Sequence, residues 1–237
     1  MTAGAGSRVR LVPRHRTALA SWSLVEAELA GLRMALEHSA AEHLIVLSGS
    51  CYPLVSVAEL EDDLAQWRGV PRLRLFPLPH PLWNTPSNED GGLWRFRRRF
   101  VSLRGKVVFV GDVPLRTFRR SIPPELRLYR SSQWKIYACG HAETLLRILG
   151  ERRDLLRFWR TTLVPDEACV AFLGQHPAWL GERDCATLLA ARRAPGRPPD
   201  RRAIDAADRD TCRKLFARKL SSRDGRLLDR IDQELRT

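Results

Sequence analysis

The chain has 237 residues, of which 44% are hydrophobic and 28% charged, a composition typical of a folded globular protein rather than a disordered chain. No apolar stretch approaches the ~20 residues that a membrane-spanning helix needs, and the first 16 residues contain no apolar core of a signal peptide. The length suits one domain over residues 1–237.

The balance of charges is strongly basic. Forty Lys and Arg against 27 Asp and Glu give a net charge of +13, which attracts polyanions such as nucleic acid, anionic lipid or a nucleotide diphosphate. The five cysteines are odd in number and form no CxxC, which favours free thiols in a reducing compartment. We therefore expect a cytoplasmic protein, with peripheral association at a membrane through the basic charge left open.

The first third of the chain predicts strand, helix, strand and helix in turn. Residues 8–12 alternate like a short strand, and a helix opens at Ser21-Trp22-Ser23 and runs to Glu37, with Ser23 and Glu26 as its capping box. A buried strand over 43–47 ends in the loop Ser48-Gly49-Ser50, and Ser56 with Glu59 caps a second helix that runs to about Trp67.

The rest of the chain continues the alternation less regularly. We expect a strand over 72–78, a loop over 77–92, a basic middle with few periodic signals, a strand over 134–139 and a helix over 141–149 that Gly150 stops. A strand-like segment over 159–164 then leads into Pro165-Asp166-Glu167 and a helix over 168–173. The last part of the chain predicts a strand over 185–191, an exposed Arg/Pro-rich insertion over 192–202, and helices over 208–220 and 224–236.

This order predicts an α/β fold with a mostly parallel central sheet. Ligands of such sheets bind beyond the carboxyl ends of the strands, which directs attention to the loops at 48–53, 139–141 and 164–167. Common catalytic signatures are missing: the sequence has no GxGxxG, no P-loop, no HExxH, no GxSxG and no Asp-x-Asp pair after a predicted strand. We therefore expect no metal ligands.

Five short segments carry a family resemblance. They are Ala20-Ser21-Trp22-Ser23, Leu47-Ser48-Gly49-Ser50-Cys51-Tyr52-Pro53-Leu54, Ser132-Gln133-Trp134, Val164-Pro165-Asp166-Glu167 and Leu215-Phe216-Ala217-Arg218-Lys219. In this order and spacing the chain resembles the core-2/I-branching β-1,6-N-acetylglucosaminyltransferase family, which includes peptide O-xylosyltransferases. The resemblance implies an inverting transferase of GT-A fold that uses a UDP-sugar donor without a metal ion or other cofactor.

The resemblance also implies roles for individual residues. Glu167 matches the family's catalytic base, Lys219 and Arg183 match its cations for the donor pyrophosphate, and Trp134 matches a residue of the acceptor-side wall. Asp166 is expected beside the substrate.

The residues themselves leave simpler interpretations open. Asp166 and Glu167 favour a first helical turn electrostatically, Lys219 and Arg183 suit solvated positions, and Trp134 suits a core. The backbone amides of Ser48, Gly49 and Ser50 could meet a sugar or a phosphate, or form an ordinary tight turn.

Three functions follow as hypotheses. The first is a metal-independent transferase that moves N-acetylglucosamine or xylose from a UDP-sugar to an acceptor hydroxyl, with a glycan among the candidate acceptors. The family begins with a strand, a helix and a His-Val-Asp segment that this sequence lacks, so we expect an N-terminally truncated member without the first βα unit. The second hypothesis is therefore a catalytically inactive relative that binds a glycan or a partner. A basic nucleic-acid-binding protein is the third, although no nucleic-acid partner is expected because no known binding motif is present.

Overall fold

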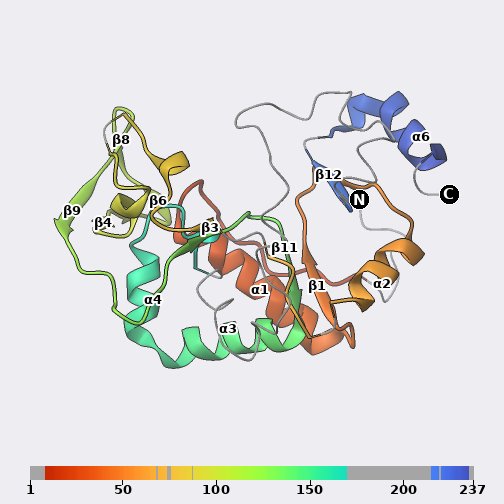
Figure 1. The fold of residues 1–237 in the computed structure, drawn as a ribbon, viewed down its shortest axis with the longest axis horizontal. Helices are drawn as coiled ribbons and strands as arrows, with labels where there is room; N and C mark the ends of the chain where they lie inside the picture. Colours follow the sequence, from red (N-terminus) through yellow and green to blue (C-terminus); the bar gives the residue numbers. More distant parts are fainter. Residues whose placement is uncertain are drawn as a thin grey trace.

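The computed structural model describes residues 9–67, 69–73, 76–86, 88–169, 215–218 and 220–234. Figure 1 shows a mixed α/β molecule in which helix α1 lies near the centre. The helices are α1 (Trp22–His38), α2 (Val57–Ala65), α3 (Cys139–Glu151), α4 (Arg153–Arg160) and α6 (Gly225–Glu234). The strands outside the basic middle are β1 (His43–Val46), β2 (Cys51–Pro53), β3 (Phe76–Pro77), β10 (Tyr129–Arg130), β11 (Lys135–Ala138) and β12 (Phe216–Arg218).

The strand pair beside α1 runs antiparallel. β1 pairs with β11 from His43 opposite Ala138 to Val46 opposite Lys135, and every other sheet within the described ranges is also a two-stranded antiparallel pair. The mostly parallel sheet predicted from the sequence is therefore not seen there. Parallel strands are usually buried on both faces, whereas Leu44 is the only buried residue of β1, so this partly exposed strand suits antiparallel pairing with the more deeply buried β11.

One hydrophobic core joins α1, α3 and α4 to the β1–β11 pair. Every third or fourth residue of α1 faces this core, which gives the helix the apolar stripe that the sequence predicts. The fully enclosed side chains include Val25, Tyr137, Leu145 and Trp159. This core fixes the start of α1, against which the candidate site lies.

The helix starts follow the predicted pattern at α2 but not at α1. Ser56 accepts a hydrogen bond from the Glu59 backbone N–H at 3.3 Å, and the Glu59 carboxylate accepts one from the Ser56 N–H at 2.9 Å, so the predicted capping box is confirmed. The predicted box of Ser23 and Glu26 is wrong. Helix α1 already begins at Trp22, and the Ser23 hydroxyl accepts a hydrogen bond from the Ala18 N–H at 2.9 Å instead.

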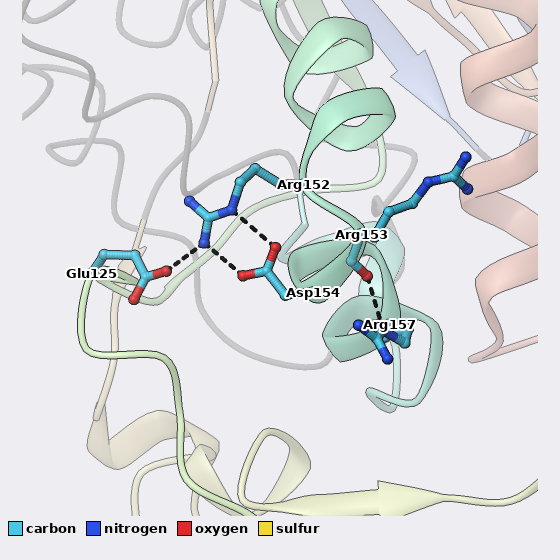
Figure 2. Close-up of polar contacts among 5 residues, drawn as sticks. All are labelled: Glu125, Arg152, Arg153, Asp154 and Arg157. Atoms are coloured by element: carbon cyan, nitrogen blue, oxygen red, sulfur yellow. Dashed lines mark hydrogen bonds and ion pairs between the residues drawn. The ribbon is translucent and has the colours of Figure 1, made fainter.

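Helices α3 and α4 meet at Arg152. The predicted stop at Gly150 is wrong, since α3 continues through Glu151 at the modest cost that an interior glycine carries. The Arg152 guanidinium donates to both oxygens of Asp154, at 2.9 and 2.6 Å, and to Glu125 at 2.7 Å (Figure 2). In the same view, Arg157 Nε donates to the Arg153 carbonyl one turn earlier in α4. These contacts tie the break between the helices to the loop at Glu125.

The basic middle of the chain forms three small antiparallel pairs that the sequence did not predict. We call residues 98–119 the hairpin module; it contains β4 (Arg98–Phe100), β5 (Ser102–Leu103), β6 (Lys106–Val107), β7 (Phe109–Val110), β8 (Val113–Pro114) and β9 (Arg116–Arg119). Positive φ angles at Arg104 and Gly105 match the two-residue turn that favours a tight hairpin. Figure 1 shows the module at the opposite end of the molecule from β12 and α6.

The C-terminal strand β12 lies against β2, with Phe216 opposite Pro53 and Arg218 opposite Cys51. The helix predicted over 208–220 is therefore wrong at 216–218, whereas α6 confirms the last helix. These residues instead form backbone hydrogen bonds with the edge of β2, and a helical pattern of apolar residues cannot predict such pairing.

Other predicted elements differ or cannot be compared. Residues 9–12 form no strand, and the described residues of 72–78 contain β3 and one bridge at Arg72. Residues 159–160 end α4, and Ala168 and Cys169 lie in a turn. The strand over 185–191 and the insertion over 192–202 lie outside the described residues. No helix in the described ranges has both the length and the apolar character needed to cross a membrane.

Candidate functional site

The 3₁₀ turn Pro165–Glu167 is fixed by backbone contacts to two distant segments. The Val164 N–H donates to the Ala20 carbonyl at 3.0 Å, just before α1, and the Ser131 N–H donates to the Glu167 carbonyl at 2.5 Å. Val164 has a φ of 54°, a strained value for a β-branched residue that turns the chain sharply into Pro165. The turn thus holds Glu167 beside the segment that follows β10.

The Glu167 carboxylate forms an ion pair with the last residue of β10. Its Oε2 lies 2.5 Å from Arg130 Nη2, and both side chains are about one quarter exposed. The Arg130 guanidinium also lies over the ring of Trp83, 3.1 Å from the ring centroid. An aromatic face and a carboxylate therefore hold this cation from two directions.

A pocket opens at this ion pair. Its cavity volume is about 10 Å³, within about 240 Å³ of empty space that includes open solvent, and its lining consists of Leu78, Trp83, Gly92, Arg95, Phe96, Arg130, Val164, Glu167 and Ala168. Gly92 has a φ of 91°, and a Cβ there would lie 3.0 Å from the Cβ of Trp83. A side chain at position 92 would therefore press on Trp83, so the glycine preserves the wall of the pocket.

Two partly buried guanidiniums and one carboxylate give the pocket a positive balance. Burial lowers the pKa of Arg130 to about 10, although the Glu167 charge opposes the shift. Burial also lowers the pKa of Arg95, again against the attraction of Glu167. Both side chains still carry a positive charge at neutral pH, so the pocket presents a half-buried carboxylate among cations.

Asp166 occupies a different environment from Glu167. It is only 5% exposed, does not line the pocket, and burial raises its pKa to about 6, with the nearby Glu167 charge acting in the same direction. The role of Asp166 beside a substrate stays a prediction. In the described chain only Glu167 of this pair reaches the pocket.

The loop Ser48-Gly49-Ser50 connects β1 to β2. Its hydroxyls lie 3.1 Å apart, and the Cys51 N–H donates to the Ser48 carbonyl at 2.9 Å. A Cβ added at Gly49 would meet no atom within 4 Å, so the loop is open there. The Leu220 N–H donates to the Ser50 carbonyl at 3.1 Å, which holds the C-terminal segment at this loop.

Trp134 lies in the segment that joins β10 to β11. It is half-buried, does not line the pocket, and comes directly before β11, whose first residue, Lys135, pairs with the last residue of β1. Ser131, which contacts the Glu167 backbone, is three residues earlier, and three residues span at most about 10 Å. Trp134 is therefore within about 10 Å of the residue that contacts the Glu167 backbone, and the next residue, Lys135, lies opposite the end of β1.

The remaining predicted site residues cannot be placed. Lys219 and Arg183 lie outside the described residues. Conversely, no sequence pattern singled out Arg130, Arg95 and Trp83, which line the pocket with Glu167. The signal available for them was weak, since the arginines belong to a basic stretch that resembles a solvated run. Among the described residues no group of three or more His, Cys, Asp or Glu could hold a metal ion.

Comparison with known families supports the resemblance for the first part of the chain. Residues 4–70 match the model of the Core-2/I-Branching enzyme family. This stretch contains α1, β1, the Ser48–Ser50 loop, β2 and α2, and therefore includes two of the five segments on which the resemblance rests. A search of curated proteins finds no match. The core-2/I-branching match thus includes the Ser48–Ser50 loop, whereas every residue that lines the Glu167 pocket lies beyond it.

Proposed function

We propose that the chain is a glycosyltransferase of the core-2/I-branching kind, which transfers N-acetylglucosamine or xylose from a UDP-sugar to an acceptor hydroxyl with inversion and without a metal ion. The observation that carries this proposal is the Glu167 carboxylate, which lines a pocket among Arg130, Arg95 and Trp83. The family match over residues 4–70 supports the transferase class, and the pocket supports the position of the base.

In this mechanism Glu167 acts as general base. Its carboxylate takes the proton of the acceptor hydroxyl while the hydroxyl oxygen forms a bond to the anomeric carbon from the face opposite UDP. The bond between that carbon and the UDP oxygen breaks, and its electron pair leaves with UDP. Because Arg130 holds Oε2, we assign the proton to Oε1. Arg130 then acts as a positioning residue that limits the rotation of the base.

The departing diphosphate requires positive charge at the other end of the site. We assign this role to Lys219 and Arg183, with the Ser48–Ser50 loop as a further contact. The pairing of β12 with β2 supports the first assignment, since Arg218 and Leu220, on either side of position 219, contact Cys51 and Ser50. Preorganised cations at this loop would replace a metal ion in stabilising the leaving group.

The decisive test compares Glu167→Gln with the parent chain. Glutamine keeps the size of the side chain but cannot take the proton, so transfer from UDP-N-acetylglucosamine or UDP-xylose should fall by about 10²-fold or more. UDP binding, measured by calorimetry, should stay within about threefold, because the base contacts the acceptor rather than the diphosphate. Glu143→Gln, on an exposed position of α3, serves as the matched control and should leave both unchanged.

Further arms separate this proposal from its alternatives. Transfer should survive EDTA, and Lys219→Ala should lose most of it. UDP binding without any turnover by the parent would identify an inactive relative, and binding to duplex DNA without UDP binding would identify a nucleic-acid-binding protein. Near-parental transfer by Glu167→Gln, or activity that manganese restores after EDTA, would contradict the assigned mechanism.

A further inference from the structure

The hairpin module exposes a group of large apolar side chains to solvent. They are Leu103, Phe109, Val110, Val113, Leu115 and Phe118, with exposed fractions between 39% and 88%. Val110 and Val113 face each other across the β7–β8 turn, so two exposed aliphatic side chains flank its tip. Within the described chain no segment covers them, and a concentration of exposed apolar residues is typical of an interaction surface.

The same module carries a strong and unbalanced positive charge. Its cations are Arg98, Arg99, Arg104, Lys106, Arg116 and Arg119, against the single acid Asp112. The strand register places Arg98 opposite Arg119, although like charges across a strand pair destabilise it. None of the six cations forms an ion pair with an acid of the described residues.

The module is also held firmly to the rest of the molecule. Phe100 and Val107 are buried with Leu163 in a small hydrophobic cluster, and the Phe100 N–H donates to the Thr161 carbonyl at 2.9 Å. The Ser23 hydroxyl of α1 donates to the Gly105 carbonyl at 3.2 Å. The apolar and basic side chains therefore project from an anchored scaffold, which reduces the entropy that ordering would cost on binding.

We propose that the hairpin module docks the protein on the surface of a bilayer that contains anionic lipids. The cations would meet the lipid phosphates, while Val110, Val113 and Phe118 would enter the boundary between headgroups and acyl chains. Nucleic acid would satisfy the cations but offers aliphatic valines no apolar partner. A second copy of the chain would place like charges face to face. This surface is distinct from the Glu167 pocket, so the proposal does not depend on the proposed reaction.

The experiment is co-sedimentation of the full chain with vesicles. Vesicles of phosphatidylcholine alone should bind little, whereas an equimolar mixture with phosphatidylglycerol should bind the chain and release it at high salt. Each cation near an anionic surface contributes about fivefold to partitioning, so Arg116→Gln with Arg119→Gln should weaken binding about 25-fold. Val110→Ser with Phe118→Ser should weaken it by at least about tenfold through lost apolar burial.

Matched controls remove the same kind of group elsewhere. Arg33→Gln with Arg223→Gln takes away two exposed cations, and Val57→Ser takes away a valine whose exposed fraction, 65%, nearly equals the 67% of Val110. Both controls should bind within about twofold of the parent, because docking depends on the site of the residues rather than on net charge.

Several results would overturn the proposal. One is the absence of binding to the anionic vesicles, and another is equal binding by the hairpin and control variants. Binding to soluble polyglutamate but not to vesicles would indicate an acidic protein partner instead. Self-association in sedimentation velocity that Val110→Ser abolishes would indicate an interface between copies.

Discussion

Asp166 and His141 are two buried titratable side chains whose pKa values move in opposite directions. Burial raises the pKa of Asp166 from 3.8 to about 6, and burial, with the Lys135 charge, lowers the pKa of His141 from 6.5 to about 4. His141 is fully enclosed and stacks on Tyr137, with 5.3 Å between the ring centroids. Each group therefore resists becoming charged inside the fold.

The two shifts have opposite consequences for stability between pH 4 and pH 6. The folded state holds the Asp166 proton more tightly than the unfolded chain, so this group makes stability fall as pH rises through that range. His141 binds its proton more weakly when folded, so its contribution to stability is lost as pH falls from 6.5 toward 4. Each effect is at most about 3 kcal/mol, and because the two effects have opposite signs over this pH range, they nearly cancel.

We predict that two substitutions reveal how each group separately makes the free energy of unfolding depend on pH. Asp166→Asn leaves His141 alone, so its free energy of unfolding should rise from pH 4 to pH 6, whereas that of His141→Phe should fall. Urea unfolding at a series of pH values measures both, with the exposed Asp229→Asn as a control that keeps the parental profile. Identical profiles for the two variants would show that the two groups are not buried as described.

At the scale of secondary structure, a buried ion pair joins α1 to β11. Lys135 Nζ lies 3.0 Å from both Glu28 oxygens, the two side chains are 0% and 7% exposed, and the Tyr137 hydroxyl donates to the same carboxylate. Removing only the lysine would leave a buried carboxylate without its counter-charge, which typically costs about 3–5 kcal/mol.

We therefore predict a strong coupling in a double-mutant cycle. Lys135→Met should lower the free energy of unfolding by about 3–5 kcal/mol, and adding Glu28→Gln should restore a substantial part of it because no lone charge remains. Arg147→Met breaks the exposed pair with Glu151 and should cost less than about 1 kcal/mol. Additive effects of the two core substitutions in urea unfolding would refute the coupling.

The elements that the sequence predicted are those whose pattern is local. Helices α1, α2 and α3 carry apolar residues at helical spacing, and β1 and β11 are short apolar runs, so their positions follow from the sequence. The antiparallel direction of the β1–β11 pair does not follow from the sequence, because an apolar run has the same pattern in a parallel and in an antiparallel pair. The strands of the hairpin module could not be predicted because they have two to four residues each and most of these residues are exposed.

The candidate site could likewise be predicted only in part from the sequence. The resemblance singled out Glu167 from one short segment, but Trp83 and Arg130 reach it from segments 84 and 37 positions earlier in the chain. Such a meeting depends on how the segment that carries Trp83 and the end of β10 pack beside the turn, which no periodicity records. Arg130 could be noticed only as one arginine among many.

For the whole molecule, the excess of 13 positive charges should make stability depend on salt. Self-repulsion destabilises a compact chain of high net charge, and raising NaCl from about 0.01 M to about 0.1 M shortens the Debye length from about 30 Å to about 10 Å. The exposed ion pairs that salt also weakens contribute at most about 1 kcal/mol each. We predict that the melting temperature rises over this range, as calorimetry would show. A falling melting temperature would mean that ion pairs outweigh the repulsion.

The pairing of β2 with β12 has a consequence for synthesis on the ribosome. The two strands are separated by about 160 residues, so β2 emerges long before its partner has been translated. At roughly 5–20 residues per second, the edge of β2 waits on the order of 10–30 s with its backbone groups open to other chains. The nascent polypeptide therefore passes through a stage in which a chaperone that shields strand edges would raise the yield of the folded product.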